Sequence, residues 1–179
     1  MIVETIKKQY ARRLIEAYRS PYNDPFTYQL VTEFGIERLV PLLAPFIDNK
    51  TNSDAMAQSW IEWNGLIIDR ESHLQHWFVA LFSGELIGIL LPSRFNEPHQ
   101  DGGSLTMIAV LPEYQGMGYG KILHAKGLEI LAGMGVTKYT GSTDVRNMPM
   151  LATFRSNGCE FTRIRTIEVD ELGRHHPID

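Results

Sequence analysis

A glycine-rich segment, residues 115–121, holds the residue types best suited to chemistry with an anionic ligand. It reads Gln-Gly-Met-Gly-Tyr-Gly-Lys and lies between an apolar run ending at Val110 and a helical pattern starting near Gly118. Glycine permits positive φ and lets a ligand approach the backbone closely. A helix start presents unpaired N–H groups and the positive end of the helix dipole. The segment therefore predicts a phosphate-binding turn, with a purely structural turn as the alternative.

Two widespread phosphate motifs do not fit this turn. A P-loop needs Gly-Lys followed by Ser or Thr, whereas Ile122 follows Lys121 here. The dinucleotide fingerprint needs Gly-x-Gly-x-x-Gly, whereas the glycines here are Gly116, Gly118 and Gly120. A nucleotide-binding protein is therefore disfavoured.

The turn does match Gln-x-x-Gly-x-Gly, through Gln115, Gly118 and Gly120, and Val110-x-Pro112 precedes it. This pattern resembles the GCN5-related N-acetyltransferase (GNAT) family, in which it holds the pyrophosphate of acetyl-CoA. A second stretch, residues 147–161, is similar to the family's Asn-x-x-Ala-x-x-x-Tyr-x-x-x-Gly-Phe segment. The resemblance covers about residues 77–169, with a looser match from residue 27.

The resemblance implies an α/β (α+β) fold of the acyl-CoA N-acyltransferase type. Its mixed, mostly antiparallel central sheet has six or seven strands flanked by helices, and the pantetheine arm inserts between two splayed central strands. The residues implied to contact the cofactor are Ile108, Ala109 and Val110 by their backbone, Gln115, Gly116, Met117, Gly118, Tyr119, Gly120 and Lys121 around the pyrophosphate, and Asn147 and Phe154 beside the arm.

Some positions depart from the family pattern. The family's tyrosine, which often protonates the departing thiolate, is Phe154 here and cannot donate a proton. Met150 replaces the usual Ala and Cys159 the usual Phe. Ser104 and Thr106 stand where some members carry a Glu. These departures concern catalysis and leave the implied cofactor site intact.

Transfer to an amine requires a base, because a lysine-like amine has a pKa near 10.4 and is protonated at pH 7. Asp144, at the end of the strand before Asn147, is our first candidate for the base. The alternative role of Asp144 is to cap the following helix. His99 and Asp101, in the loop before the motif strand, are further candidates.

We expect acetyl transfer from acetyl-CoA, as co-substrate, to a primary amine of a small molecule or peptide. The alternative function is a non-catalytic acyl-CoA-binding module, which Phe154 makes plausible. Trp60 and Trp63, on a helix expected over 53–68, are either core residues or part of an acceptor pocket, and Glu62 is either solvated or faces a cationic substrate.

Composition narrows the remaining classes. The chain has 179 residues, which suits one domain, and a net charge of −4, which argues against nucleic acid as a partner. No apolar run reaches the roughly 18 residues of a membrane span. Its single cysteine, Cys159, allows no intrachain disulfide and no cysteine-rich metal site. We expect a cytoplasmic protein with no metal and no membrane partner; a homodimer stays open.

The hydrophobic pattern predicts two parts, a helical extension over 1–22 and the acetyltransferase domain over 23–179. The extension is a basic amphipathic helix over 2–19, packed on the domain or lying on a membrane surface. The expected strands are 27–33, 77–82, 86–91, 105–110, 138–143 and 161–169. The expected helices begin at Ile36 and Ser53 and cover 118–134 and 148–156, with a polar tail from Glu171.

Overall fold

The computed structural model describes residues 1–43, 46, 74–171 and 173–179. These residues form a sheet of eight strands in the order β2-β3-β4-β5-β6-β1-β7-β8. The strands are β1 (Ile2–Leu14), β2 (Thr27–Leu30), β3 (Phe78–Phe82), β4 (Glu85–Arg94), β5 (Gly102–Val110), β6 (Lys138–Asp144), β7 (Glu160–Asp170) and β8 (His175–Pro177). The helices are α1 (Val31–Phe34), α2 (Ile36–Leu43), α5 (Tyr119–Gly133) and α6 (Met148–Ser156). The mixed, mostly antiparallel sheet agrees with the expected fold.

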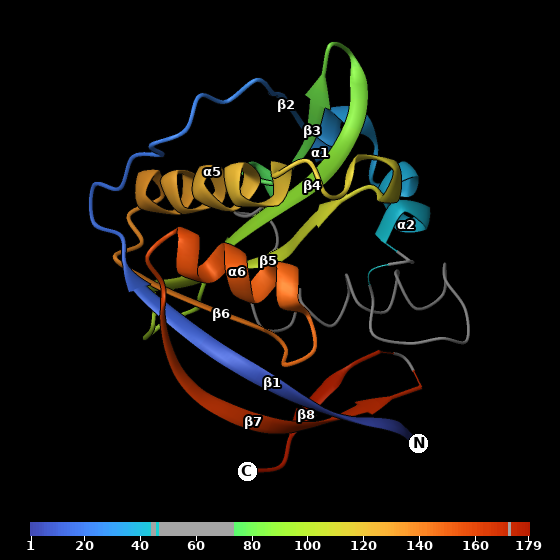
Figure 1. Cartoon of the computed structure of the whole chain (residues 1–179), viewed down its shortest axis with the longest axis vertical. Coiled ribbons are helices and arrows are strands. Elements are labelled where there is room, and N and C mark those ends of the chain that lie inside the picture. Colours follow the sequence, from blue (N-terminus) through green and yellow to red (C-terminus); the bar gives the residue numbers. More distant parts are fainter. Residues whose placement is uncertain (44–45, 47–73, 172) are drawn as a thin grey trace.

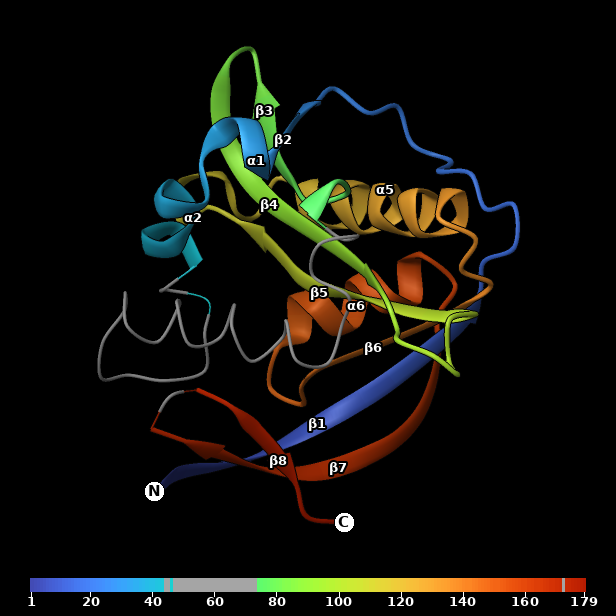
Figure 2. The ribbon, with the colours of Figure 1, turned by 180° about the vertical axis from the view of Figure 1, so that it is seen from behind.

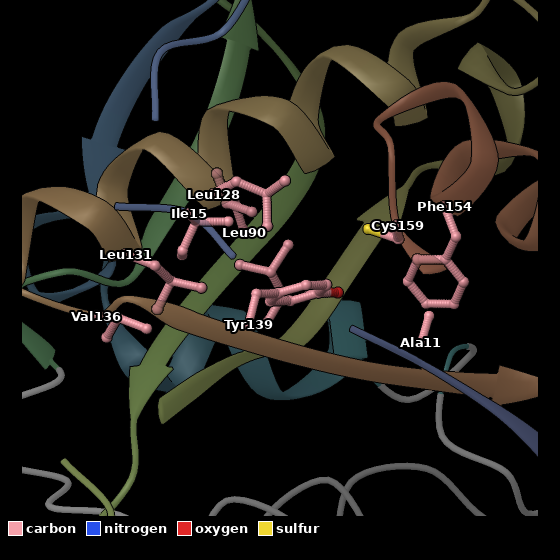
Figure 3. Close-up of a cluster of buried hydrophobic side chains, with 10 residues drawn as sticks. Ala11, Ile15, Leu90, Leu128, Leu131, Val136, Tyr139, Phe154 and Cys159 are labelled. Atoms are coloured by element: carbon pink, nitrogen blue, oxygen red, sulfur yellow. The ribbon is translucent and has the colours of Figure 1, made fainter. Parts of the chain in front are cut away.

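Helices cover both faces of the sheet. Figure 1 shows α5 and α6 on one face, and Figure 2, from behind, shows α1 and α2 on the other. The buried cluster under α1 and α2 includes Leu39, Trp77 and Ile89. The cluster under α5 and α6 includes Leu90, Leu128 and other side chains drawn in Figure 3. Within the described residues, no helix is long and apolar enough to cross a membrane.

The predicted helix over residues 2–19 is wrong. Residues 2–14 are the strand β1, which pairs antiparallel with both β6 and β7. The two buried residues of β1, Ile6 and Ala11, are five positions apart, so they face opposite sides of the sheet and join different clusters. β1 therefore has no single buried face with the two-residue period of a strand, and its apolar residues have a spacing that imitates a helix. The N-terminal segment is thus part of the sheet and not a helical extension.

Two further boundaries differ from the prediction. The strand expected over 27–33 ends at Leu30, and Val31 starts the short helix α1. The polar tail forms the strand β8, which pairs with β7. The hairpin β3–β4, the strands β5, β6 and β7 and the helices α2, α5 and α6 are confirmed within a few residues. The helix expected over 53–68, with Trp60, Glu62 and Trp63, lies outside the described residues.

Candidate functional site

The neighbouring strands β5 and β6 separate near the centre of the sheet, and the gap between them is called the splay below. These parallel strands pair only at Gly102 with Lys138 and Gly103 with Tyr139, and then they diverge (Figure 1). The register of β5 against β4 shifts, so that Thr106 is an extra residue in β5. A bulge bends its strand, which helps β5 turn away from β6. From Ser104 onward, β5 has no described strand on its β6 side.

The backbone of β5 offers hydrogen-bonding groups to this gap. The carbonyl oxygen of Ala109 points to β4, since a Cβ built on Gly88 would lie only 2.5 Å from it. Successive peptide groups of a strand alternate in direction, so those of Ile108 and Val110 face the gap. The carbonyl of Val110 accepts a hydrogen bond of 2.9 Å from Nε2 of Gln115. Ile108, Ala109 and Val110 are expected to contact the pantetheine arm by their backbone. Of these three, Ile108 therefore has the most peptide groups available to a ligand in the gap.

The glycine turn stands at the open end of the gap. Gly116 and Gly118 have φ of +81° and +79°, a conformation that other residues rarely adopt. Gly118 caps α5 with no side-chain hydrogen bond, so the first N–H groups of the helix are available to a ligand. The turn from Gln115 to Gly118 is exposed, and so is Lys121 in the first turn of α5. These features are the ones that the predicted anion site requires, and binding of a phosphate there stays a prediction.

Not every predicted contact in the turn can use its side chain. The Tyr119 ring packs against Phe26, with ring centroids 5.0 Å apart, and so only its backbone is free to face a ligand. The Lys121 ammonium lies 5.5 Å from the centroid of the Tyr22 ring, a cation–π contact on the surface. The side chain of Met117, by contrast, is 61% exposed and can face a ligand.

Asn147 has a structural role at the start of α6. Its Oδ1 accepts from the Met150 backbone N–H at 3.2 Å, and its Nδ2 donates to Oγ1 of Thr143 at 3.0 Å. It is therefore the cap of α6 that the sequence assigned to Asp144 as an alternative. Its predicted place beside the pantetheine arm stays a prediction.

Phe154 lies in the core under α6, with 1% of its surface exposed. Its ring makes edge contacts with His124 and Phe161, at centroid distances of 5.6 and 6.4 Å. The predicted place of Phe154 beside the cofactor stays a prediction.

Asp144 is held by a neighbouring arginine. Its Oδ1 accepts from the backbone N–H and from Nε of Arg146, at 2.8 and 2.9 Å, and its Oδ2 accepts from Nη2 of the same side chain. The hydrogen bonds from Arg146 lower the pKa of Asp144, against an opposing effect of burial. A lower pKa makes a weaker base, so the pairing does not favour Asp144 as the base.

His99 and Asp101, the other candidate bases, lie in a hollow of about 560 Å³ at the closed end of the splay. The hollow is also lined by Phe95, Glu97 and Lys138. Lys138 forms an ion pair of 2.9 Å with Asp101, and this contact lowers the pKa of the Asp101 carboxyl. The exposed Asp101 is thus a weak base, and His99 stays a prediction.

Sequence reasoning missed a chain of hydrogen-bonded polar residues, three of them buried and one, Tyr22, half-buried. Tyr139 on β6 is hydrogen bonded to His124 on α5, His124 to Asn157, and Asn157 to Tyr22, at 3.1, 2.8 and 2.8 Å. The only sequence signal was that Tyr139 and Gly141 alternate on one face of a predicted strand. Their partners come from distant segments, so no local pattern could pair them.

The comparisons agree with this geometry. A profile of the acetyltransferase (GNAT) family matches residues 36–159, more than half of the chain. Among solved structures, the fold resembles an acetyltransferase from the GNAT family from Colwellia psychrerythraea, with a TM-score of 0.64, 13% identity, and coverage of 93% of this chain and 57% of that one. A GCN5-related N-acetyltransferase from Sphaerobacter thermophilus gives a TM-score of 0.62 at 12% identity, covering 93% and 53%.

This chain spans a little over half the length of those two structures. A tandem GNAT protein from the clavulanic acid biosynthesis pathway shows the same proportion, with a TM-score of 0.57, 15% identity, and coverage of 93% of this chain and 55% of that one. No curated protein sequence matches the chain. At these identities the structures show the fold, and the profile shows the family: the chain belongs to the acetyltransferase (GNAT) family.

Proposed function

We propose that this protein transfers an acetyl group from acetyl-CoA to a primary amine. One observation carries the proposal: the uncapped start of α5, with its two left-handed glycines, opens onto the splay between β5 and β6. A phosphate site and a slot lined by backbone groups, side by side, suit the two ends of a CoA molecule. The family of the chain supports acyl transfer in general.

The start of α5 supplies the recognition of the pyrophosphate. The helix dipole stabilises an anion by about 0.3–2 kcal/mol, so several N–H hydrogen bonds from residues 116–121 must provide most of the binding free energy. The first turn of α5 contains no acidic residue that would repel a phosphate. Lys121 adds a positive charge within that turn.

The splay supplies a place for the pantetheine arm. Its amide groups can pair with the peptide groups of Ile108 and Val110 as an added strand would. This contact uses the backbone alone and therefore does not depend on the side chains that depart from the family pattern.

The acceptor is limited by the cost of its deprotonation at pH 7. This cost is about 4.6 kcal/mol for a lysine-like amine and about 1.4 kcal/mol for an α-amine with a pKa near 8. Asp144 and Asp101 are both ion-paired with lowered pKa values and are weak bases. An α-amine is therefore the acceptor that this set of residues serves best.

The test is release of free thiol from acetyl-CoA in the presence of a panel of primary amines, followed with a thiol-reactive chromophore. The single cysteine gives little background, because burial raises the pKa of Cys159 to about 11. We expect amine-dependent release that is lost in Gly118→Asp and kept in Gly84→Asp. Gly84 also has positive φ and open space around it, but lies in the β3–β4 hairpin.

Two results would contradict the proposal in different ways. Binding of acetyl-CoA without thiol release by any amine would support the non-catalytic acyl-CoA-binding module instead. Absence of both binding and release would remove acyl-CoA from the function altogether.

A further inference from the structure

The hydroxyl of Tyr139 is buried beside the splay. Tyr139 is 2% exposed, and its ring packs in the same cluster as Leu105 of β5 and Leu128 of α5. Figure 3 shows the hydroxyl directed toward the side on which Phe154 lies. A Cβ on Gly141 would collide with this hydroxyl, so glycine is needed there for Tyr139 to take this position.

The hydrogen bonds around His124 fix where its proton resides. Nδ2 of Asn157 lies 3.0 Å from the carbonyl oxygen of Lys121, which can only accept, so this end of the side chain is the NH₂ group. The same nitrogen lies 2.8 Å from Nδ1 of His124, which must therefore accept. Oδ1 of Asn157 then accepts from the hydroxyl of Tyr22 at 2.8 Å, as its orientation requires.

His124 is neutral, because burial lowers its pKa to about 3. With Nδ1 accepting, its one proton is on Nε2, which donates to the Tyr139 hydroxyl at 3.1 Å. The hydroxyl oxygen is thus an acceptor in its only hydrogen bond within the described part of the chain. The proton of Tyr139 has no acceptor there, and a buried unpaired donor is costly.

The position of this donor matches the reach of a pantetheine arm. Continuing the register of Gly103 with Tyr139, Gly141 stands level with Leu105, five residues before Val110. At about 3.3 Å per residue these five residues span about 17 Å. The arm has about twelve chain bonds, as many as four extended residues, and covers about 14 Å. A phosphate bound level with Val110 would therefore bring the sulfur to within about one residue of the level of Leu105, and so near Tyr139.

We propose that Tyr139 donates a hydrogen bond to the sulfur of CoA and so stabilises the thiolate that leaves during transfer. This inference rests on the proposed function. The amine nitrogen forms a bond to the acetyl carbon, the carbon–sulfur bond breaks, and sulfur leaves with the electron pair. The proton of the amine passes to a base or to water, and Tyr139 keeps its own.

Tyr139 acts as a hydrogen-bond donor and not as an acid for a physical reason. Burial raises the pKa of Tyr139 well above its usual value, whereas a thiol has a pKa near 8.5. Full proton transfer from the phenol to the thiolate is therefore uphill. A hydrogen bond to a charged acceptor is stronger than one to a neutral acceptor and forms only as charge develops on sulfur. The donor thereby substitutes for the hydroxyl that Phe154 lacks.

The experiment is a pH titration of the thiol of bound CoA, followed by the ultraviolet absorbance of the thiolate. It needs no acceptor amine. We expect the bound thiol to have a pKa about one unit or more below its value in Tyr139→Phe. Tyr22→Phe is the matched control, because it removes a hydroxyl from the far end of the same chain of hydrogen bonds. It should titrate like the wild type.

A second measurement uses only the unaltered protein and so does not depend on the folding of a variant. The affinities of CoA and of desulfo-CoA, which lacks the thiol, are compared by calorimetry at pH 7 and pH 9. If a thiol pKa near 8.5 falls by one unit on binding, the affinity of CoA relative to that of desulfo-CoA should rise by about sixfold from pH 7 to pH 9.

The outcomes separate the inference from the proposed function. Equal thiol pKa values in the wild type and in Tyr139→Phe, or an affinity ratio that does not change with pH, would overturn the role of Tyr139. Failure of the wild type to bind either CoA or desulfo-CoA would instead overturn the proposed function.

Discussion

Arg146 binds both carboxylate oxygens of Asp144, through Nε to Oδ1 and through Nη2 to Oδ2. The backbone N–H of the same arginine adds a third hydrogen bond. The pair joins the end of β6 to the start of the loop before α6. Asp144 is thus a fixed anion with a lowered pKa.

This pairing leads to a prediction for catalysis. Asp144→Asn should lower the rate of acetyl transfer at pH 7 by less than about tenfold, because loss of a true general base costs roughly 100-fold or more. Arg146→Ala is the companion variant: it would raise the pKa of Asp144 and strengthen it as a base. A drop of 100-fold in Asp144→Asn, shrinking toward high pH, would instead make Asp144 the base.

We predict that the free energy of unfolding decreases in mild acid because His124 is buried in its neutral form. Its pKa is about 6.5 in the unfolded chain and about 3 in the fold, so the unfolded state takes up the proton first. Stability therefore falls as the pH drops below 6.5 toward 3, by about 2 kcal/mol at pH 5. Urea unfolding at pH 7 and pH 5 measures this change.

The matched variants for this prediction are His124→Gln and His99→Gln. The first should lose that part of the pH dependence, whereas the second removes an exposed imidazole and should keep it. An identical pH dependence in the wild type and in His124→Gln would mean that His124 is not buried as described.

Gly141 should not tolerate a side chain. In Gly141→Ala the new Cβ would meet the hydroxyl of Tyr139 and would lie 3.0 Å from Cε1 of Phe154. We expect a loss of about 1–3 kcal/mol in the free energy of unfolding, and less in the Tyr139→Phe background. Gly133→Ala is the control, since open space surrounds that helical glycine and alanine should be neutral or stabilising there. Equal effects of the two substitutions would refute the packing of Tyr139.

The strand β1 gives a test of the corrected N-terminus. Ile6 is 4% exposed and packs with Ile167 and Val169 of β7, whereas Val3 is 51% exposed. Ile6→Asn should cost about 2–4 kcal/mol by urea unfolding, and Val3→Asn within about 0.5 kcal/mol. Similar small costs for both would fit a detachable extension rather than a strand inside the sheet.

Much of the fold could be predicted because the chain from residue 77 onward has clear local signals. The Ser83–Gly84 turn separates two apolar runs and predicts the hairpin, and the glycine turn predicts the start of α5. The strand β1 could not be predicted, because its buried residues Ile6 and Ala11 face opposite sides of the sheet and give no alternation of the kind on which strand prediction rests. β8 could not be predicted either, because this edge strand is mostly polar.

Part of the candidate site could likewise be predicted from the sequence, and part could not. The turn at residues 115–121 is local, so the sequence alone specifies it. The cap of α6 was assigned to Asp144 as an alternative because Asp and Asn cap equally well, and only the structure identifies Asn147. The chain from Tyr139 to Tyr22 joins four segments, and the sequence pattern carries no information on such a tertiary contact.

The most direct test of the central claim is calorimetric titration of acetyl-CoA into the wild type, Gly118→Asp and Gly84→Asp. The claim is that the start of α5 holds the pyrophosphate beside the splay. In Gly118→Asp, a side chain and a negative charge would occupy the approach of the phosphate. We predict binding by the wild type and by Gly84→Asp, and at least a 100-fold weaker affinity for a folded Gly118→Asp. Equal affinity in all three proteins would place the pyrophosphate elsewhere and contradict the account.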